Sequence, residues 1–301
     1  MIVGTGNVGA SIAFALLNQR TPVSELILTD LDMHDAEGEA MDLRDALAIA
    51  PSWLKICASD YSSAQNCDIC VITAGANQKP GETRTDLLQK NAAIIKNIVK
   101  QVMQNSFNGI FIVVSNPMDA LSYLTWQYSG LPCEQVIGSG TILDSARLRL
   151  KLSEHLDVHP KSIHAYQVGE HGDSEFTLWS SANVGGENIT KLISDSKREQ
   201  ITEAVRHEAY EIIQKKGATH YGIGVCTVQI INCILNDERR VLPVSSLDDC
   251  NDVYSGFPCV IGRQGIIRRL DIPMTEQEGI KMQQSVNVLK RTLSEIKEES
   301  K

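Results

Sequence analysis

The hexapeptide Gly169-Glu170-His171-Gly172-Asp173-Ser174 contains the residue types that point most directly to chemistry. His171 can give or take a proton near neutral pH, and Asp144 is the carboxylate that would orient its ring. Arg147 follows Asp144 by three residues, so on a helix the two share a face, and a guanidinium can hold an anion. A base, an orienting acid and an anion holder together predict proton transfer on a small anionic substrate.

A glycine-rich loop near the N-terminus, Gly4-Thr5-Gly6-Asn7-Val8-Gly9, predicts a dinucleotide site. Gly4 permits a tight turn, Gly6 lets the backbone approach a pyrophosphate, and Gly9 lets the helix pack on the strand. Asn7 and Val8 open that helix, whose N-terminal end would face the pyrophosphate. With His171, this loop favours hydride transfer over hydrolysis.

Asp30 ends the next expected strand, where a carboxylate can accept the ribose hydroxyls of the cofactor. Its negative charge repels a 2′-phosphate, which favours NAD over NADP. Asp32 is a second candidate for this position, ranked lower because it lies beyond the strand end.

A second candidate arginine, Arg84, ends the segment Gly75-Ala76-Asn77-Gln78-Lys79-Pro80-Gly81-Glu82-Thr83-Arg84. This segment follows a strand end, where open α/β sheets place their ligands. Pro80-Gly81 gives it turn chemistry, and we expect a loop that closes over the site. Arg84 could then polarise a reacting carbonyl once water is excluded.

The first half of the chain alternates short apolar runs with helical patterns, which predicts βαβ units and a parallel sheet. Expected strands are Met1–Val3, Glu25–Asp30, Lys55–Ala58, Asp68–Thr73, Gly109–Ser115 and Gln135–Ile137, and expected helices are 8–18, 37–48 and 86–104. The first strand is short, so we expect either a clipped strand or a native chain that begins further upstream.

The second half predicts a mixed α+β domain. Strand-like runs cover Ile163–Val168, Phe176–Val184, Arg240–Ser245 and Gly265–Ile272, with helices near 197–215 and 222–235. A last helix starts at a capping box formed by Thr275 and Glu278. The expected fold is therefore α/β, with a Rossmann-type dinucleotide-binding domain over residues 1–138 and a mixed α+β catalytic domain over 139–301.

Composition narrows the classes of function. A net charge of −9 argues against a nucleic-acid or anionic-membrane surface, and no apolar run is long enough for a span or signal peptide. Among the 8 cysteines, Cys67-Asp68-Ile69-Cys70 has metal spacing but no partner pair. We interpret these as buried thiols, expect no metal, and expect a reducing cytoplasm.

Several segments, in order along nearly the whole chain, resemble the L-lactate and malate dehydrogenase family, and within it the bacterial L-lactate dehydrogenases. They are Gly4–Gly9, Gly75–Arg84, Val114–Pro117, Gly138–Arg149, Gly169–Ser174 and Gly217–Thr219. The resemblance implies reversible NADH-dependent reduction of pyruvate to L-lactate, with a Rossmann domain, a catalytic domain and assembly as a homotetramer.

The resemblance also implies a role for each matching residue. His171 would be the proton donor and acceptor, with Asp144 as its partner. Arg147 would grip the substrate carboxylate and Arg84 would polarise the C2 carbonyl. Asn116 would bind substrate and the nicotinamide side, and Thr219 would line the substrate pocket.

Gln78 bears on the choice between lactate and malate. The malate branch needs a cation there for the second carboxylate of its substrate, whereas Gln78 is neutral. Lys79, a neighbouring cation, is the one confounder. Two alternatives stay open, a malate or other L-2-hydroxyacid dehydrogenase and a catalytically inactive NAD-binding module. The intact set of His171, Asp144, Arg147 and Arg84 argues against the second.

Arg149 and His164 match positions that bind fructose 1,6-bisphosphate in allosteric bacterial members of the family. Arg149 lies about 200° around the helix from Arg147, so it should serve a different ligand. Ordinary polar surface residues are the alternative interpretation.

Overall fold

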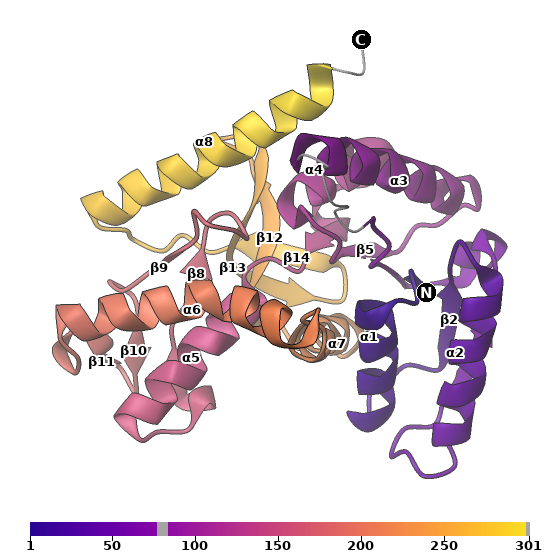
Figure 1. Cartoon of the computed structure of the whole chain (residues 1–301), viewed down its shortest axis with the longest axis horizontal. Helices are drawn as coiled ribbons and strands as arrows, with labels where there is room; N and C mark the ends of the chain where they lie inside the picture. Colours follow the sequence, from indigo (N-terminus) through magenta and orange to yellow (C-terminus); the bar gives the residue numbers. More distant parts are fainter. Residues whose placement is uncertain (77–83, 299–301) are drawn as a thin grey trace.

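One nine-stranded sheet forms the centre of the molecule (Figure 1). The structure is a computed structural model that describes residues 1–76 and 84–298. The strand order of the sheet is β14-β13-β12-β6-β5-β4-β1-β2-β3. Six strands are parallel, namely β1 (Ile2–Val3), β2 (Glu25–Thr29), β3 (Lys55–Ala58), β4 (Ile69–Ile72), β5 (Ile110–Val113) and β6 (Val136–Gly138). The order 3-2-1-4-5-6 is that of the doubly wound dinucleotide-binding fold, which confirms the predicted fold class.

The sheet continues into the second half of the chain. Three antiparallel strands, β12 (Arg240–Asp248), β13 (Val253–Gly262) and β14 (Gly265–Arg269), extend it from β6 through a pairing of Ser245 with Gly138. β13 was missing from the sequence prediction because Gly256 and Pro258 interrupt its pattern. It is nonetheless buried and hydrogen-bonded along β12.

The expected strands Ile163–Val168 and Phe176–Val184 are wrong as single elements. Each is divided into short strands in small separate sheets: β7 (Ile163–His164), β8 (Gln167–Val168), β9 (Phe176–Thr177) and β10 (Asn183–Val184), with β11 (Glu187–Asn188) beside β10. A turn after Val168 carries the histidine hexapeptide between β8 and β9. The apolar pattern identified the buried residues here but not the breaks between them.

Helices cover both faces of the central sheet (Figure 1). They are α1 (Asn7–Asn18), α2 (Met33–Ala46), α3 (Arg84–Gln104), α4 (Met118–Ser129), α5 (Ile142–Leu156), α6 (Asp195–Lys216), α7 (Tyr221–Leu235) and α8 (Glu276–Glu298). Within the described residues, none of these helices has the length and apolar character needed to cross a membrane.

Two of the three apolar clusters in the described core lie on opposite faces of the central sheet. Phe111 and Val113 of β5 belong to the cluster that contains α3, α4 and α8, whereas Ile110 and Ile112 belong to the one that contains α1 and α7. This alternation follows from the two-residue period of a strand that is buried on both faces.

The capping box predicted at the start of the last helix is confirmed by its hydrogen bonds. The Thr275 backbone N–H donates to Glu278 Oε2 at 2.9 Å, and the Glu278 N–H donates to Thr275 Oγ1 at 3.3 Å, which is a capping box ahead of α8. All eight cysteines are free, and Cys70 is buried within β4 with Cys67 half-buried just before it.

The backbone of the glycine loop shows what surrounds each of the three glycines. Gly4 has a φ of +99°, and a Cβ on Gly9 would lie 1.9 Å from the carbonyl oxygen of Gly4. A Cβ on Gly6 would meet nothing within 4 Å, so the space in front of it is open. The loop therefore has the turn, the open approach and the close helix contact that a dinucleotide needs.

Gly9→Ala should consequently lower the thermal midpoint of unfolding by about 5 °C or more, because the methyl group displaces the Gly4 carbonyl. Gly38→Ala, inside exposed α2, is the matched control: its Cβ meets nothing within 4 Å, and alanine favours a helix by about 1 kcal/mol. Thermal denaturation followed by circular dichroism checks both. An equal response of the two variants would contradict the packing argument.

Candidate active site

His171 and Asp144 form a hydrogen-bonded pair in the wall of a cavity. His171 Nδ1 lies 2.8 Å from Asp144 Oδ2, and the Asp144 side chain is only 5% exposed, whereas that of His171 is 30% exposed. Asp144 lies in the first turn of α5, directly after the carboxyl end of β6. With Nδ1 occupied, Nε2 is the ring atom left to exchange a proton with a ligand.

Arg147 holds the other oxygen of the same carboxylate. Its Nη1 donates to Asp144 Oδ1 at 3.0 Å, and its side chain is 7% exposed. Burial would raise the pKa of Asp144, but the positive charge and hydrogen bond of His171, with the charge of Arg147, hold that pKa below its usual value. The guanidinium has four further N–H donors, so it can still bind an anion.

The charge of Asp144 also acts on the histidine. Burial disfavours the imidazolium, but the Asp144 charge and hydrogen bond outweigh it and raise the pKa of His171 to about 9. His171 is therefore protonated at neutral pH, which is the form that can donate a proton.

The backbone of the histidine loop is fixed by residues that the sequence analysis did not identify. Gly169 exchanges two backbone hydrogen bonds with Gly256 of β13, at 2.8 and 2.7 Å. The His171 backbone N–H donates to Asp119 Oδ2 at 2.7 Å, and Ser245 Oγ donates to Asp119 Oδ1 at 2.5 Å. Burial raises the pKa of Asp119 to about 6, although these two bonds oppose the rise.

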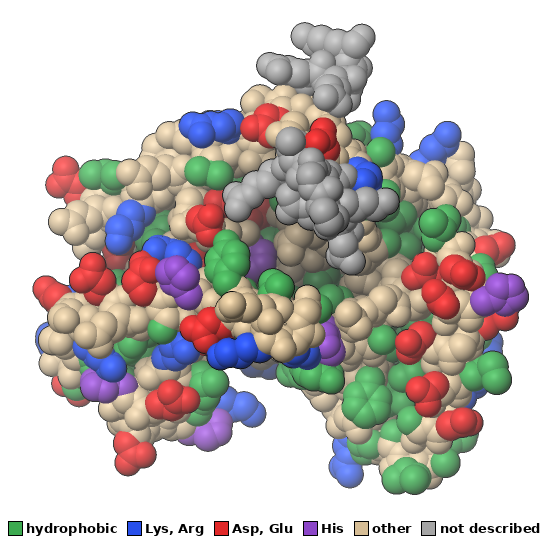
Figure 2. Space-filling view, viewed as in Figure 1, with side chains coloured by type: hydrophobic (Ala, Val, Ile, Leu, Met, Phe, Trp, Pro, Cys, Tyr) green, Lys and Arg blue, Asp and Glu red, His purple; other side chains and the backbone are tan. Residues whose placement is uncertain are grey.

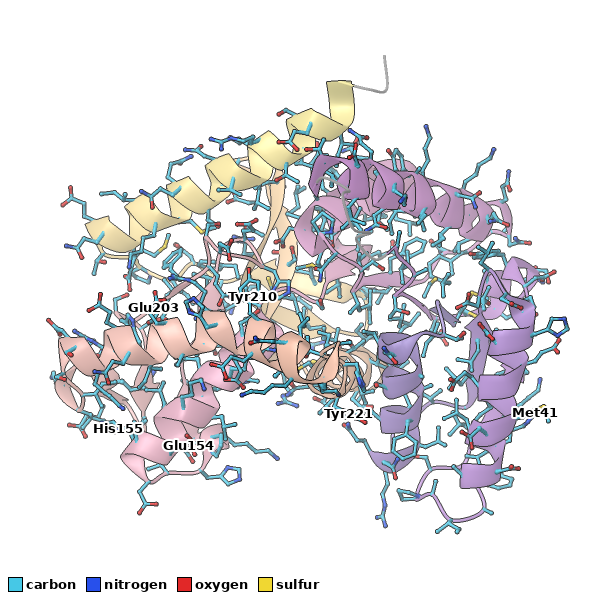
Figure 3. The ribbon with its side chains drawn as sticks, in the orientation of Figure 1. Met41, Glu154, His155, Glu203, Tyr210 and Tyr221 are labelled. Atoms are coloured by element: carbon cyan, nitrogen blue, oxygen red, sulfur yellow. The ribbon has the colours of Figure 1, made fainter. Side chains whose placement is uncertain are left out.

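A cavity of about 560 Å³ opens in front of the pair. Its lining includes His171, Asp144, Arg147 and Asn116, which come from three different segments of the chain. Asn116 lies next to a cis peptide bond with Pro117, and its carbonyl accepts from Asn91 Nδ2 at 2.8 Å. Tyr210, which also lines the cavity, projects from α6 toward the middle of the molecule (Figure 3).

The dinucleotide loop lies at the point where the strand order reverses, between β1 and β4. Asp30 sits just beyond β2, and its Oδ2 accepts from the Thr5 backbone N–H at 2.6 Å and from Thr5 Oγ1 at 2.9 Å. These bonds hold the pKa of Asp30 below its usual value, although burial acts in the opposite direction. The open space at Gly6, the start of α1 and this carboxylate fit a dinucleotide.

Asp32 has a different function from the one considered for it. Its side chain accepts from the His34 backbone N–H at 3.0 Å and caps α2. The helix therefore begins at Met33, four residues before the predicted start. The capping residue could have been found from its type and position alone.

Four further candidates are not brought into this cluster by the described coordinates. Gln78 lies outside the described residues, and Arg84 is described only as the first residue of α3. Thr219 lies in the turn between α6 and α7 and does not line the cavity. Arg149 Nε donates to the Ser145 carbonyl at 3.2 Å.

His164, the other candidate for a bisphosphate site, is exposed on β7. Its backbone partner in the small sheet is Asn183. No contact between His164 and Arg149 is described, so the two remain separate candidates.

Asp119 and Glu175 are the acidic residues that the sequence analysis missed. Both are buried, at 3% and 5% exposed. An acid inside the apolar run Met118–Leu121 was a usable signal, because such residues are rarely buried without a partner. Glu175 gave no comparable signal, because it follows a polar segment.

Two family descriptions match the chain. The lactate/malate dehydrogenase NAD binding domain matches residues 1–138, and the lactate/malate dehydrogenase alpha/beta C-terminal domain matches residues 141–300. The chain is 49% identical to the L-lactate dehydrogenase of Streptococcus pneumoniae strain 70585, covering 98% of this chain and 93% of that protein. It is 44% identical to L-lactate dehydrogenase 2 of Bacillus anthracis, with 98% and 97% covered.

Solved structures agree with these matches. A lactate dehydrogenase from a Medee basin deep-sea metagenome library superposes with a TM-score of 0.97 at 46% identity, covering 98% of both chains. The minor L-lactate dehydrogenase of Enterococcus mundtii in its ligands-bound form gives a TM-score of 0.94 at 44% identity, with 97% of this chain and 96% of that one covered.

Removal of the Asp144 charge should lower the pKa of His171. In Asp144→Asn we expect that pKa to fall by about 1–3 units, because the imidazolium loses its buried counter-ion. Diethyl pyrocarbonate reacts with neutral imidazole, so the pH dependence of His171 modification, quantified by peptide mass spectrometry, measures the pKa. Asp157→Asn, at the exposed end of the same helix, is the control. An unshifted His171 pKa in Asp144→Asn would refute the pairing.

Proposed function

Because the chain belongs to the lactate/malate dehydrogenase family and acts as an NAD-dependent L-lactate dehydrogenase, we propose that His171, Asp144 and Arg147 carry out the reversible reduction of pyruvate. The observation that carries the proposal is the His171 Nδ1–Asp144 Oδ2 distance of 2.8 Å beside a buried arginine in one cavity. Those three groups supply the proton donor, its counter-ion and an anchor for a carboxylate.

Arg147 binds the carboxylate of pyruvate through the N–H donors that do not face Asp144. A planar guanidinium suits two parallel hydrogen bonds to a carboxylate, which would fix the orientation of the substrate. The position of the adjacent carbonyl is then set relative to His171, because both side chains line the same cavity.

His171 donates the proton from Nε2 to the carbonyl oxygen as the alkoxide develops. When NADH is bound, it supplies the hydride to the carbonyl carbon. Asp144 stabilises the imidazolium before the transfer and keeps the ring in its tautomer afterwards. In the direction of lactate oxidation, neutral His171 accepts the hydroxyl proton.

Three other residues complete the proposed substrate site. Arg84, the first residue of α3, would polarise the C2 carbonyl. Asn116 would contact substrate and the nicotinamide side, which its place in the cavity lining supports. Thr219, in the turn between α6 and α7, is proposed for the pocket on the family resemblance alone, because it does not line the cavity formed by the described residues.

For the cofactor we propose the segment Gly4–Gly9 at the pyrophosphate and Asp30 at the adenosine ribose. The carboxylate of Asp30 stands against Thr5 of that loop, which supports this assignment over Asp32. The ribose hydroxyls would donate hydrogen bonds to the carboxylate oxygens of Asp30. The negative charge of Asp30 would disfavour a 2′-phosphate.

Assembly as a homotetramer is also a proposal. A groove of about 580 Å³ between α1, α2 and α7 supports it, because Phe14, Tyr221 and Val225 line this groove and are 57%, 71% and 52% exposed. Figure 3 shows Tyr221 beside α7, and Figure 2 shows the notch that separates α1 and α2 from α5 and α6 on this face. Exposed apolar surface of this kind is typical of an interface between copies.

Three finer assignments remain proposals. Fructose 1,6-bisphosphate would bind at Arg149 and His164, for which the exposure of His164 gives modest support. The two domains would divide at residues 138 and 139. A cytoplasmic location is in keeping with eight free cysteines.

The activity test follows NADH absorbance with pyruvate and then with oxaloacetate. We expect the larger kcat/KM with pyruvate. Because the pKa of His171 is raised to about 9 and reduction needs the protonated ring, kcat/KM should be level below that pH and fall above it. Lactate oxidation, which needs the neutral ring, should instead rise toward the same pH. A preference for oxaloacetate would contradict the lactate assignment.

Gln78→Arg should move the preference toward oxaloacetate. A cation at this position would pair with the second carboxylate, which otherwise enters the site as an unpaired charge. We expect the ratio of kcat/KM for oxaloacetate over pyruvate to rise by about 10²-fold or more. Gln65→Arg, which adds the same charge at an exposed position, is the control. Equal ratios in the two variants would refute the role of Gln78.

A further inference from the structure

Glu175 is a buried carboxyl group beside the His171–Asp144 pair, and the reaction described above does not use it. A carboxylate oxygen of Glu175, one ring nitrogen of His171 and an oxygen of Asp144 all lie within 4.8 Å of one another. Glu175 also lines the substrate cavity and is 5% exposed. It directly follows the histidine hexapeptide and precedes β9.

The hydrogen bonding of Glu175 is weak for a buried acid. Gln167 Nε2 donates to its Oε1 at 3.5 Å, which is at the limit of a hydrogen bond. The orientation of that amide is fixed from the other side, because Thr177 Oγ1 donates to Gln167 Oε1 at 2.7 Å. Burial first, and then the negative charge of Asp144, raise the pKa of Glu175 well above its usual range.

Charged groups from several elements surround this carboxyl. His171 and Asp144 are nearest, and the positive charges of Arg147 on α5 and Arg206 on α6 favour its ionised form. Arg206 Nε is buried and has no hydrogen-bond partner among the described residues. Asp119 on α4 bonds the His171 amide, and Asp173 and Lys281 line the adjoining cavity with Glu175.

We propose that Glu175 is a positioning residue that sets the proton affinity of His171, adding its charge to that of Asp144 so that the imidazolium persists to higher pH. An opposite charge at 4–6 Å shifts a pKa by about 1–3 units, and a buried pair is little screened by salt. The cationic ring in turn offsets the repulsion between two neighbouring carboxylates. Glu175 and His171 therefore titrate as a coupled pair.

The consequence for turnover rests on the proposed function, whereas the proton affinity itself does not. The pKa of Glu175 is itself raised, so its charge acts only once the carboxyl group has lost its proton. From that point the proton-donating form of His171 survives further into alkaline conditions. Pyruvate reduction is then maintained to a higher pH, and lactate oxidation begins at a correspondingly higher pH.

The test compares the intact enzyme with Glu175→Gln, which keeps the shape of the side chain and removes its charge. The pH dependence of diethyl pyrocarbonate modification at His171, quantified by peptide mass spectrometry, gives the pKa without any need for activity. We expect the pKa of His171 to fall by about one unit in Glu175→Gln and by less in Glu175→Asp. Glu199→Gln, an exposed residue of α6, should leave it unchanged.

A folded Glu175→Gln enzyme with the wild-type His171 pKa overturns the proposal, because a merely structural side chain would alter thermal stability but not this titration. If Glu175→Gln does not fold, Glu175→Ala, which also removes the charge, decides in the same way. The pH limit of pyruvate reduction is recorded in parallel. A shifted His171 pKa with an unmoved activity limit would contradict the role of His171 in catalysis while supporting this inference.

Discussion

The carboxylate of Asp144 is the charge on which the whole site depends. It is nearly inaccessible to water, so it is stable only because His171 and Arg147 hold one oxygen each. Loss of either partner would leave a buried charge incompletely compensated, at a cost of about 3–5 kcal/mol. The same constraint bears on the proposed reaction, because the cation that neutralises Asp144 is the imidazolium that we propose as the proton donor. Arg147, held by the same carboxylate, is the group that we propose binds the anionic end of the substrate.

The fold delivers these groups by continuing one sheet through both halves of the chain. Asn116 follows β5 and Asp144 follows β6, so both lie at the carboxyl edge where the glycine loop follows β1. His171 comes from the other half, and β13 fixes its loop through Gly256 while Asp119 fixes its amide. Ser245, the residue through which β12 joins β6, also bonds Asp119. The same two residues, Ser245 and Asp119, therefore connect the two halves of the sheet and hold the His171 backbone in place.

Sequence reasoning succeeded where a motif has a local cause. Examples are the glycine loop, the capping box of α8 and the strands of the parallel sheet, each of which leaves a local pattern in the sequence. The structure has these elements within a residue or two of the predicted bounds. Helix α2 is an exception, because it begins earlier than predicted. β13 was missed because its glycine and proline are tolerated only through pairing with a distant strand. Asp119 gave a usable signal that was overlooked, although its partners His171 and Ser245 lie far away in sequence. Glu175 gave no such signal, because its burial beside Asp144 depends on the folded chain. Asp32 was misjudged for the opposite reason, since its local role as a cap was overlooked.

The most direct test of the account is a crystal structure of the enzyme with NADH and oxamate, an unreactive analogue of pyruvate. The account predicts the carboxylate of oxamate on Arg147, its carbonyl oxygen within hydrogen-bond distance of His171 Nε2, and His171 Nδ1 still paired with Asp144. A ligand bound elsewhere, or a His171 ring turned away from Asp144 in that complex, would contradict it.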